Sequence, residues 1–355
     1  MDNTNPRRTL INAEITIFAI GLIIGKVLTL MVIGGVFWWY LKPRLLLFGN
    51  VSTYSSNTFS RATATFGAST QVPIGSFNYG GSTVWAPIRQ LVDAQIQSDR
   101  PELQLQYVNP KNGSPSSSKG IRMLLDGQLD FAQSSRPLTD EEYATAKQRG
   151  FTLSQRQVGI DGIAVVVNPS LQVSGLTINQ LQQIYLGQIT NWKQVGGPNL
   201  PITPFSQRPL DADTQIFSPQ QPPSSQVKYV NSTTEALRQV SKTPGGVYYA
   251  SARTVVPQCS VKALPLGNTP NQLISPYRQP LVPPQKCPSQ RNQVNTEAIK
   301  NGSYPITTKL YVIIKQNKGR EQQVGEAYAK LLLSEQGRLA IEQAGLVGVG
   351  AGYVH

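Results

Sequence analysis

The segment of residues 116–137 constrains the fold most, because it predicts a loop, a helix, a strand and a second loop in direct succession. Ile121, Leu124 and Leu125 recur with helical spacing, and the three serines before them are residues that favour helix starts. Gly127 is a helix stop signal, and the apolar run after it predicts a short strand. A succession of this kind is typical of an α/β domain.

The start of this helix has the outline of an anion site. Ser117 and Ser118 lie where free backbone N–H groups and the positive end of the helix dipole attract negative charge. Ser134 and Ser135 follow the next strand, and ligands of open α/β sheets bind at the carboxyl ends of strands. The plain alternative is a pair of helix caps and a surface turn.

A similar pattern occurs earlier, at residues 77–92. A strand leads into Gly80 and Gly81, which allow close backbone approach, and then into a helix start with Ser82 and Thr83. Alone this pattern is weak, because such residues are also ordinary turn and cap residues. The segment therefore gives a second outline of an anion site, of the same kind as the first.

Charge and residue counts narrow the possible partners and chemistry. The formal net charge of +13 favours anionic partners, but no nucleic-acid motif accompanies it, and we expect no nucleic-acid partner. His355 is the only histidine, which argues against histidine catalysis and histidine metal sites, and we expect no cofactor. Cys259 and Cys287 can form one disulfide or remain two thiols, and an oxidising compartment would favour the disulfide.

The N-terminal part predicts a membrane anchor. Residues 15–41 are mostly apolar and long enough to span a bilayer, with an aromatic belt at residues 38–40 and Lys26 as the one costly residue. No small-residue cleavage site follows, so we expect an uncleaved anchor within residues 1–44. Residues 45–75 contain a Ser-, Thr- and Asn-rich stretch and read as a flexible tether.

Four motifs stand out in the first half of the sequence: Tyr79-Gly-Gly-Ser-Thr-Val84, Ser118-Lys-Gly-Ile-Arg122, Asp126-Gly-Gln-Leu-Asp-Phe131 and Ser134-Ser-Arg-Pro-Leu-Thr-Asp-Glu-Glu142. Together with a Thr-Pro-Gly turn at Thr243 and a strand ending at Arg208, they resemble motifs of the PstS-like phosphate-binding proteins of ABC transporters. The resemblance covers roughly residues 76–345.

This resemblance implies an α/β fold with two lobes, the type II fold of periplasmic binding proteins, here preceded by a transmembrane helix. The first lobe would comprise residues 76–160 and 300–355, and the second lobe with the crossover would comprise residues 161–299.

The resemblance also implies a set of binding residues. In the family an anion is held by hydroxyls, backbone N–H groups and one arginine that pairs with it in a bidentate manner. These groups fall on the Thr83 hydroxyl, the Val84 N–H, Ser117 or Ser118, and Arg208, with Thr214 as a further match.

The sequence departs from the family pattern in two segments. The aspartate that accepts the phosphate proton in the family would fall at Ser135. Asp211 and Asp213 occupy a helix start where the family has small residues, and a carboxylate there would compete with an anion. Either Asp211 or Asp213 takes over as proton acceptor, or the site is degraded.

The sequence therefore predicts a bacterial substrate-binding protein that captures phosphate or a similar oxyanion for an ABC transporter permease. Its lobes would face the periplasm or the cell exterior from a single-pass anchor in the cytoplasmic membrane. The alternative is a tethered sensor or scaffold with a degraded anion site. The Ser-x-x-Lys pattern at residues 116–119 lacks the other motifs of penicillin-binding serine enzymes, so we expect no enzyme activity.

Overall fold

The computed structural model describes residues 66, 71–208, 216, 222–287 and 289–350. These residues belong to a compact unit that begins at Thr63. The expected anchor at residues 15–41 and most of the expected tether lie outside the described residues. Among the residues that are described, no helix is both long and apolar enough to cross a membrane.

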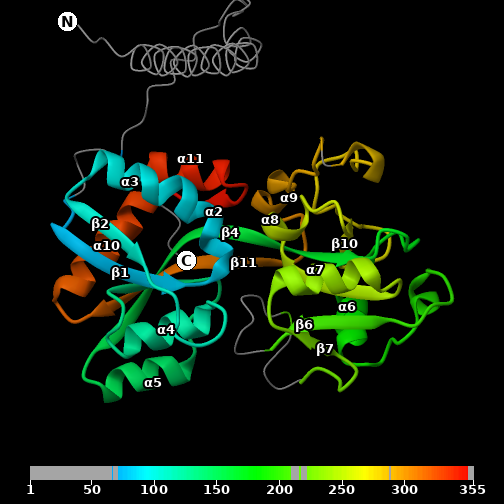
Figure 1. Cartoon of the computed structure of the whole chain (residues 1–355), viewed down its shortest axis with the longest axis horizontal. Helices are drawn as coiled ribbons and strands as arrows, with labels where there is room; N and C mark the ends of the chain where they lie inside the picture. Colours follow the sequence, from blue (N-terminus) through cyan, green and yellow to red (C-terminus); the bar gives the residue numbers. More distant parts are fainter. Residues whose placement is uncertain (1–65, 67–70, 209–215, 217–221, 288, 351–355) are drawn as a thin grey trace, which may run out of the picture. The chain divides into compact units, whose positions relative to one another are not determined.

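One half of the unit, called the first half below, contains residues from both ends of the described chain. Its strands form one part of a large sheet (Figure 1). Its strands are β1 Gly75–Gly81, β2 Leu103–Tyr107, β3 Phe131–Ser134, β4 Thr152–Val167 and β11 Thr307–Gln316. They lie in the order β2-β1-β3-β11-β4. β1 is parallel to β2 and β3, whereas β11 runs antiparallel to β3 and β4.

Helices cover both faces of this half of the sheet. They are α2 Ala86–Ile88, α3 Ala94–Asp99, α4 Ser117–Leu125, α5 Asp140–Gln148, α10 Arg320–Leu333 and α11 Glu335–Gln343. Along β11, Val312 and Ile314 pack in the core with α3, α10 and α11, and the alternate residues Tyr311 and Ile313 pack in the core with α4 and α5. This alternation is the period-2 pattern of a strand buried on both faces.

The second half has its own core. Its strands are β5 Leu176–Thr177, β6 Thr203–Gln207, β7 Lys228–Val230, β8 Gly246–Ser251, β9 Lys262–Leu264 and β10 Leu266–Gly267. Its helices are α6 Ile178–Tyr185, α7 Thr233–Lys242, α8 Ala252–Val255 and α9 Thr296–Lys300. β8 pairs with the end of β4, β6 lies parallel to β8, and β5 and β10 form a separate parallel pair.

β4 joins the two halves. Its residues 152–162 pair with β11, and its residues 163–167 pair with β8. The short strand β12, Val347–Gly348, returns to β4 near this change of partner. The fold is therefore a two-lobed α/β structure, as the resemblance implies, with β4 as a continuous element of both lobes.

Local sequence signals account for several helix starts. Thr139 caps α5 and forms a reciprocal capping box with Glu142, and Thr177 forms the same arrangement with Gln180 at α6. Such boxes satisfy backbone N–H groups that have no partner within the helix. The helix expected after the three serines is confirmed: α4 begins at Ser117, with Ser116 as its cap.

Cys259 and Cys287 form a disulfide, with their Cα atoms 5.7 Å apart. The bridge spans a sequence separation of 28 residues and ties the segment after α8 to the irregular segment before α9. Of the two states that the sequence left open for these cysteines, the structure shows the disulfide.

Candidate functional site

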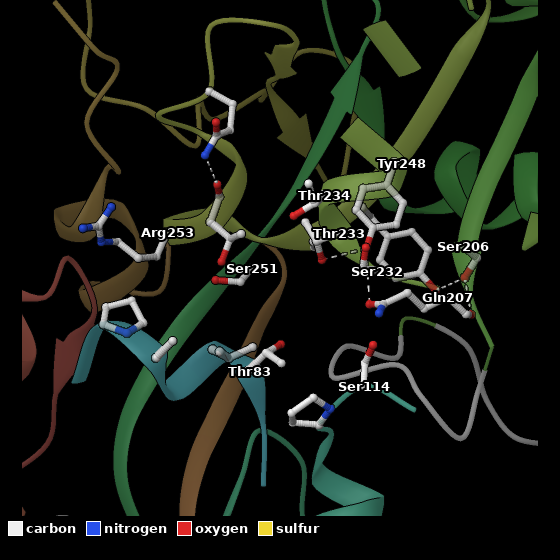
Figure 2. Close-up of a pocket in the computed structure, with 18 of the residues that line it drawn as sticks. Thr83, Ser114, Ser206, Gln207, Ser232, Thr233, Thr234, Tyr248, Ser251 and Arg253 are labelled. Atoms are coloured by element: carbon white, nitrogen blue, oxygen red, sulfur yellow. Dashed lines mark hydrogen bonds between the residues drawn. The ribbon is translucent and has the colours of Figure 1, made fainter. Parts of the chain in front are cut away.

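A pocket of about 630 Å³ is lined by residues of both halves of the unit. The first half contributes Thr83, Val84 and Ser114, and the second half contributes the ends of β6 and β8, the start of α7, and α8. In Figure 2, hydroxyl-bearing side chains of both halves surround the same space. Among the described lining residues, Arg253 carries the one formal charge, and none is Asp or Glu.

The second-half wall of the pocket is held by hydrogen bonds between side chains. Thr233 and Tyr248 share one at 3.1 Å, and the Tyr248 hydroxyl donates to Gln207 Oε1 at 3.3 Å (Figure 2). Burial raises the pKa of Tyr249 to about 12, so this neighbouring phenol stays neutral at physiological pH. Such a wall offers neutral O–H groups, which can both donate and accept.

Arg253, on α8, lies at the pocket and is also tied to the first half. Its Nε–H donates to the backbone carbonyl of Ala344, at the end of α11. A guanidinium has five N–H donors, so this bond leaves others for a ligand. Arg253 therefore places a fixed positive charge beside a pocket rich in hydroxyls.

Of the predicted first-half residues, Thr83 and Val84 line the pocket. They begin a 3₁₀ turn, Thr83–Trp85, whose cap is the fully buried Ser82. The Ser82 hydroxyl accepts a hydrogen bond from the Val84 N–H at 3.2 Å. The predicted N–H donor at Val84 is thus bonded to its own cap in this structure.

The predicted residues Ser117 and Ser135 are brought together, but behind the pocket lining. The Ser135 hydroxyl is 3.1 Å from the hydroxyl of Ser82 and 3.1 Å from that of Ser117. The Ser135 N–H donates to Ser117 Oγ at 3.0 Å. All three serines are buried, so they form an internal chain of hydroxyls that connects β1, β3 and α4.

Ser118, the other candidate at the start of α4, is bonded to Arg136. Arg136 donates to Ser118 Oγ at 2.9 Å and holds both carboxylate oxygens of Glu142, at 2.7 and 3.0 Å. Bidentate pairing of this kind commits the guanidinium to α5. Neither Ser118 nor Arg136 lines the pocket.

Arg208 is exposed and directly follows Gln207, which lines the pocket at the end of β6. Arg208 itself does not line it. Asp211, Asp213 and Thr214 lie outside the described residues, so the expectation that one of these carboxylates accepts a proton stays a prediction.

Sequence reasoning missed the two buried groups beside the pocket wall, Asp161 on β4 and Ser251 at the end of β8. Ser251 lines the pocket, and neither carboxylate oxygen of Asp161 has a hydrogen-bond partner. Burial raises the pKa of Asp161 to about 7, although the Ser251 hydroxyl and the backbone N–H groups of Arg253 and Gly162 lie close enough to lower it. The sequence feature that could have drawn attention to Asp161 is its position as a charged residue in the mostly apolar segment 160–168.

The comparisons with known proteins agree with this architecture. The "Phosphate-binding protein PstS" of Staphylococcus haemolyticus is 24% identical over 272 residues, covering 75% of this chain and 79% of that protein. The protein of the same name from Staphylococcus epidermidis is 23% identical over 279 residues, covering 77% and 78%. The chain is thus PstS-like in sequence along most of its length.

Solved structures share the fold. A Clostridium perfringens protein assigned as a phosphate ABC transporter substrate-binding protein, solved with bound phosphate, superimposes with a TM-score of 0.59 at 22% identity, covering 78% of this chain and 100% of that one. An ABC-type phosphate transport receptor of Vibrio cholerae gives 0.56 at 24% identity, covering 77% and 100%. The family model described as "PBP superfamily domain" matches residues 67–336, and the chain therefore belongs to the PBP superfamily.

Proposed function

We propose that this chain is a substrate-binding protein that captures phosphate, or a chemically similar oxyanion, for an ABC transporter. The observation that carries the proposal is the pocket between the two halves, with its many hydroxyls, one guanidinium and no carboxylate among the described lining residues. Hydroxyls and a guanidinium are the groups that bind oxyanions by charge-assisted hydrogen bonds. The role is binding, without catalysis.

The names of the relatives support the same ligand. The staphylococcal relatives are named phosphate-binding proteins, and the Clostridium perfringens structure contains phosphate. Membership of the same superfamily makes phosphate the first ligand to test on this chain.

The pocket volume supports a mechanism with closure of the lobes. A single tetrahedral oxyanion would fill only part of this volume of about 630 Å³. The two lobes must therefore move toward each other before both walls of the pocket contact the ligand. β4 continues from one half to the other and, with β11 beside it, forms the connection about which the halves would turn. Closure would remove water from the anion and strengthen its hydrogen bonds.

The finer assignments are proposals of the same kind. The binding set comprises Thr83 and Val84, the serines Ser117, Ser118 and Ser135, and Arg208, Asp213 and Thr214 after β6. The lobe boundaries are those expected from the sequence, residues 76–160 and 300–355 against 161–299. Residues 1–44 would anchor the protein in the bacterial cytoplasmic membrane with its lobes outside, next to the permease that receives the ligand.

Titration calorimetry of the full-length chain in detergent, with phosphate, arsenate and sulfate, tests the proposal. We expect phosphate to bind with micromolar or tighter affinity. Arg253→Gln or Arg208→Gln should weaken binding about ten- to a hundred-fold, since a hydrogen bond to a charged group contributes about 1.5–3 kcal/mol. Arg149→Gln is the matched control, because Arg149 is half-exposed and pairs with Asp126 away from the pocket. Absence of heat from folded protein with every oxyanion contradicts the proposal.

The sensor or scaffold function remains as a second candidate, because of one observation. The hydroxyls of Ser117 and Ser135 bond to each other instead of lining the pocket. A scaffold would bind a protein partner and give no oxyanion heat in the same titration. Asp211→Gly with Asp213→Gly then separates the two cases: if these carboxylates merely block the site, the double variant gains oxyanion binding.

A further inference from the structure

Arg89 is a partly buried cation that bonds to uncharged groups. Its Nη1 donates to the backbone carbonyl of Ser82 and to Gln133 Oε1, both at 3.2 Å. Its guanidinium carbon lies 3.9 Å from the centre of the Tyr107 ring. The ion pairs among the described residues do not include Arg89. A partly buried charge usually has an opposite charge beside it, so the contacts of Arg89 call for an explanation.

A carboxylate is present in the same helical run but is used elsewhere. Asp93 lies four residues after Arg89, and its carboxylate accepts from the hydroxyls of Tyr79 and Tyr328. Arg89 and Asp93 are the first and last residues of a π-helical segment, Arg89–Asp93. Such segments are rare and frequently lie at functional sites. The guanidinium is thus bonded to the loop before the helix and not to the carboxylate within it.

The loop that Arg89 contacts is the one that brings Thr83 to the pocket. β1 ends at Gly81, Ser82 is fully buried, and the exposed Thr83 lies on the first-half side of the pocket (Figure 2). Arg89 itself does not line the pocket. The Tyr107 hydroxyl donates to the Gly81 carbonyl at 3.0 Å. Two consecutive carbonyls of the loop are therefore held by one stacked pair, an arginine and a tyrosine.

The carbonyl of Ser82 and the N–H of Thr83 belong to one peptide group. In a planar trans peptide these two bonds point in opposite directions. A guanidinium that holds the carbonyl behind the lining therefore also fixes the direction of the N–H, on the side where Thr83 meets the pocket. The next N–H along the loop, that of Val84, is bonded to the Ser82 hydroxyl at 3.2 Å. The Thr83 N–H is thus the donor of this loop whose direction Arg89 controls.

Resting on the proposed function, we propose that Arg89 is a positioning residue for oxyanion binding that acts through the Ser82–Thr83 peptide. It directs the Thr83 N–H toward the anion without touching the anion itself. A hydrogen bond to the carbonyl also polarises the peptide, which strengthens the hydrogen bond that the N–H of the same group donates. The charge of Arg89, which no ion pair neutralises, adds to the attraction for an anion in a site of low dielectric constant.

The fold of the loop does not depend on Arg89 alone. Gly81 has a φ of +133°, and a Cβ there would collide with the backbone carbonyl of Gln133, so the loop packs directly on β3. The Ser82 N–H donates to the same carbonyl at 2.9 Å, and the Ser82 carbonyl also accepts from the Trp85 N–H at 3.3 Å. Loss of the guanidinium should therefore loosen one peptide group and leave the loop in place.

The experiment compares phosphate affinities of the full-length chain and its variants by titration calorimetry. Arg89→Met keeps an apolar stem on the Tyr107 ring but removes the charge and the donors, whereas Arg89→Lys keeps a charge and a donor. Arg100→Met is the matched control, because Arg100 is also partly buried and pairs with Glu102 at 2.8 Å. We expect Arg89→Met to weaken phosphate binding about ten-fold, Arg89→Lys to weaken it less, and Arg100→Met to leave it unchanged.

The order of the two Arg89 variants separates positioning from simple packing. A side chain that only fills space beside Tyr107 would be replaced well by Met and poorly by Lys, which is the reverse of the expected order. Tyr107→Phe examines the other member of the pair, since it keeps the ring against Arg89 and removes the hydroxyl bonded to Gly81. We expect this variant to weaken phosphate binding about two- to three-fold.

The outcomes separate this inference from the proposed function. Wild-type protein that binds no oxyanion overturns both. If the wild type binds phosphate and Arg89→Met binds it equally well, or better than Arg89→Lys, the inference alone is wrong. Should Arg89→Met fail to fold, Arg89→Lys and Tyr107→Phe decide, and wild-type affinity in both overturns the inference. Should both Arg89 variants fail to fold, Tyr107→Phe decides in the same way.

Discussion

The buried polar groups of the first half and those of the pocket wall are arranged in opposite ways. In the first half, the hydroxyls of Tyr79 and Tyr328 both donate to the carboxylate of Asp93, the second at 2.8 Å. Gln133 Nε2 donates in turn to the Tyr328 hydroxyl at 2.9 Å. At the pocket wall, neither carboxylate oxygen of Asp161 has such a partner.

The difference separates a structural role from a functional one. A buried network whose members are all bonded makes the arrangement of β1, β3 and α10 unique and stable. A buried carboxylate without a partner costs stability, and proteins tolerate such costs mainly where a site needs them. The two aspartates are similarly buried, so their partners and not their exposure distinguish them.

The largest expected effect on stability comes from disrupting the hydrogen-bonded network around Asp93. Asp93→Ala leaves the hydroxyls of Tyr79 and Tyr328 buried without their acceptor, and each such group costs about 1–3 kcal/mol. We expect the free energy of unfolding to fall by about 2–5 kcal/mol, measured by urea denaturation. Asp126→Ala, at an exposed ion pair, should change it by less than about 1 kcal/mol. A similar small change for Asp93→Ala would mean that the network contributes little.

Asp161→Asn, in contrast, should raise the free energy of unfolding at high pH. Burial raises the pKa of Asp161 to about 7, above the unfolded value near 3.8, so the folded state binds the proton more tightly. This group therefore favours the folded state at low pH, and that contribution is lost as the pH rises from about 4 to about 7. The variant should be more stable than wild type at pH 8 by about 1–3 kcal/mol.

Denaturation at pH 5 and pH 8 checks this prediction. The advantage of Asp161→Asn should shrink at pH 5, where wild-type Asp161 is mostly protonated. Asp93→Asn provides the contrast: burial also raises the pKa of Asp93, to about 6, but its two tyrosine bonds should make the substitution destabilising. If Asp161→Asn is less stable than wild type at pH 8, ionised Asp161 stabilises the fold. The contrast between Asp93 and Asp161 would then be wrong.

The sequence predicted the architecture well because the fold depends on local patterns. Helical spacing at Ile121, Leu124 and Leu125 predicted α4, and the serines before them marked its start. Gly127 and the short apolar run after it predicted β3, and the strand expected before Gly80 and Gly81 is β1. The residues of each pattern lie only a few positions apart, so each pattern can be recognised within a single segment.

The candidate site was predicted less completely, because it depends on contacts between distant segments. Thr83 and Val84 line the pocket, but Ser117 and Ser135 lie 3.1 Å from each other behind it. The motif fixes which helix start a serine occupies and does not fix whether its hydroxyl points to a ligand or to another serine. Only the packing of β1, β3 and α4 decides that.

Asp161 is a second case in which the sequence does not show a contact between distant segments. Its strand, Ile160–Asn168, reads as buried, so the sequence shows a carboxylate inside a core strand. Whether that carboxylate has a partner depends on β8, about ninety residues later in the chain, with Ser251 at its end. No spacing rule along the sequence connects these two positions.

A moderate effect is expected in the serine chain of the first half. Ser135→Ala removes the hydroxyl that lies 3.1 Å from those of Ser82 and Ser117. Loss of hydrogen bonds between buried neutral groups should lower the free energy of unfolding by about 1–2 kcal/mol, measured by urea denaturation. No loss of stability would show that these hydroxyls do not depend on one another and would weaken the contrast with the pocket wall.

The smallest effect gives the sharpest comparison, because it concerns two buried serines at equivalent positions of helices. Ser116 caps α4 by accepting from the Lys119 N–H at 3.4 Å, whereas Ser251 stands at the cap position of α8 without a capping bond. Ser116→Ala should cost about 1 kcal/mol and Ser251→Ala less than about 0.5 kcal/mol in ligand-free protein. Thermal denaturation of the two variants measures the difference. Equal losses would mean that the Ser251 hydroxyl stabilises the empty protein, and its place in the pocket wall would then need no ligand to explain it.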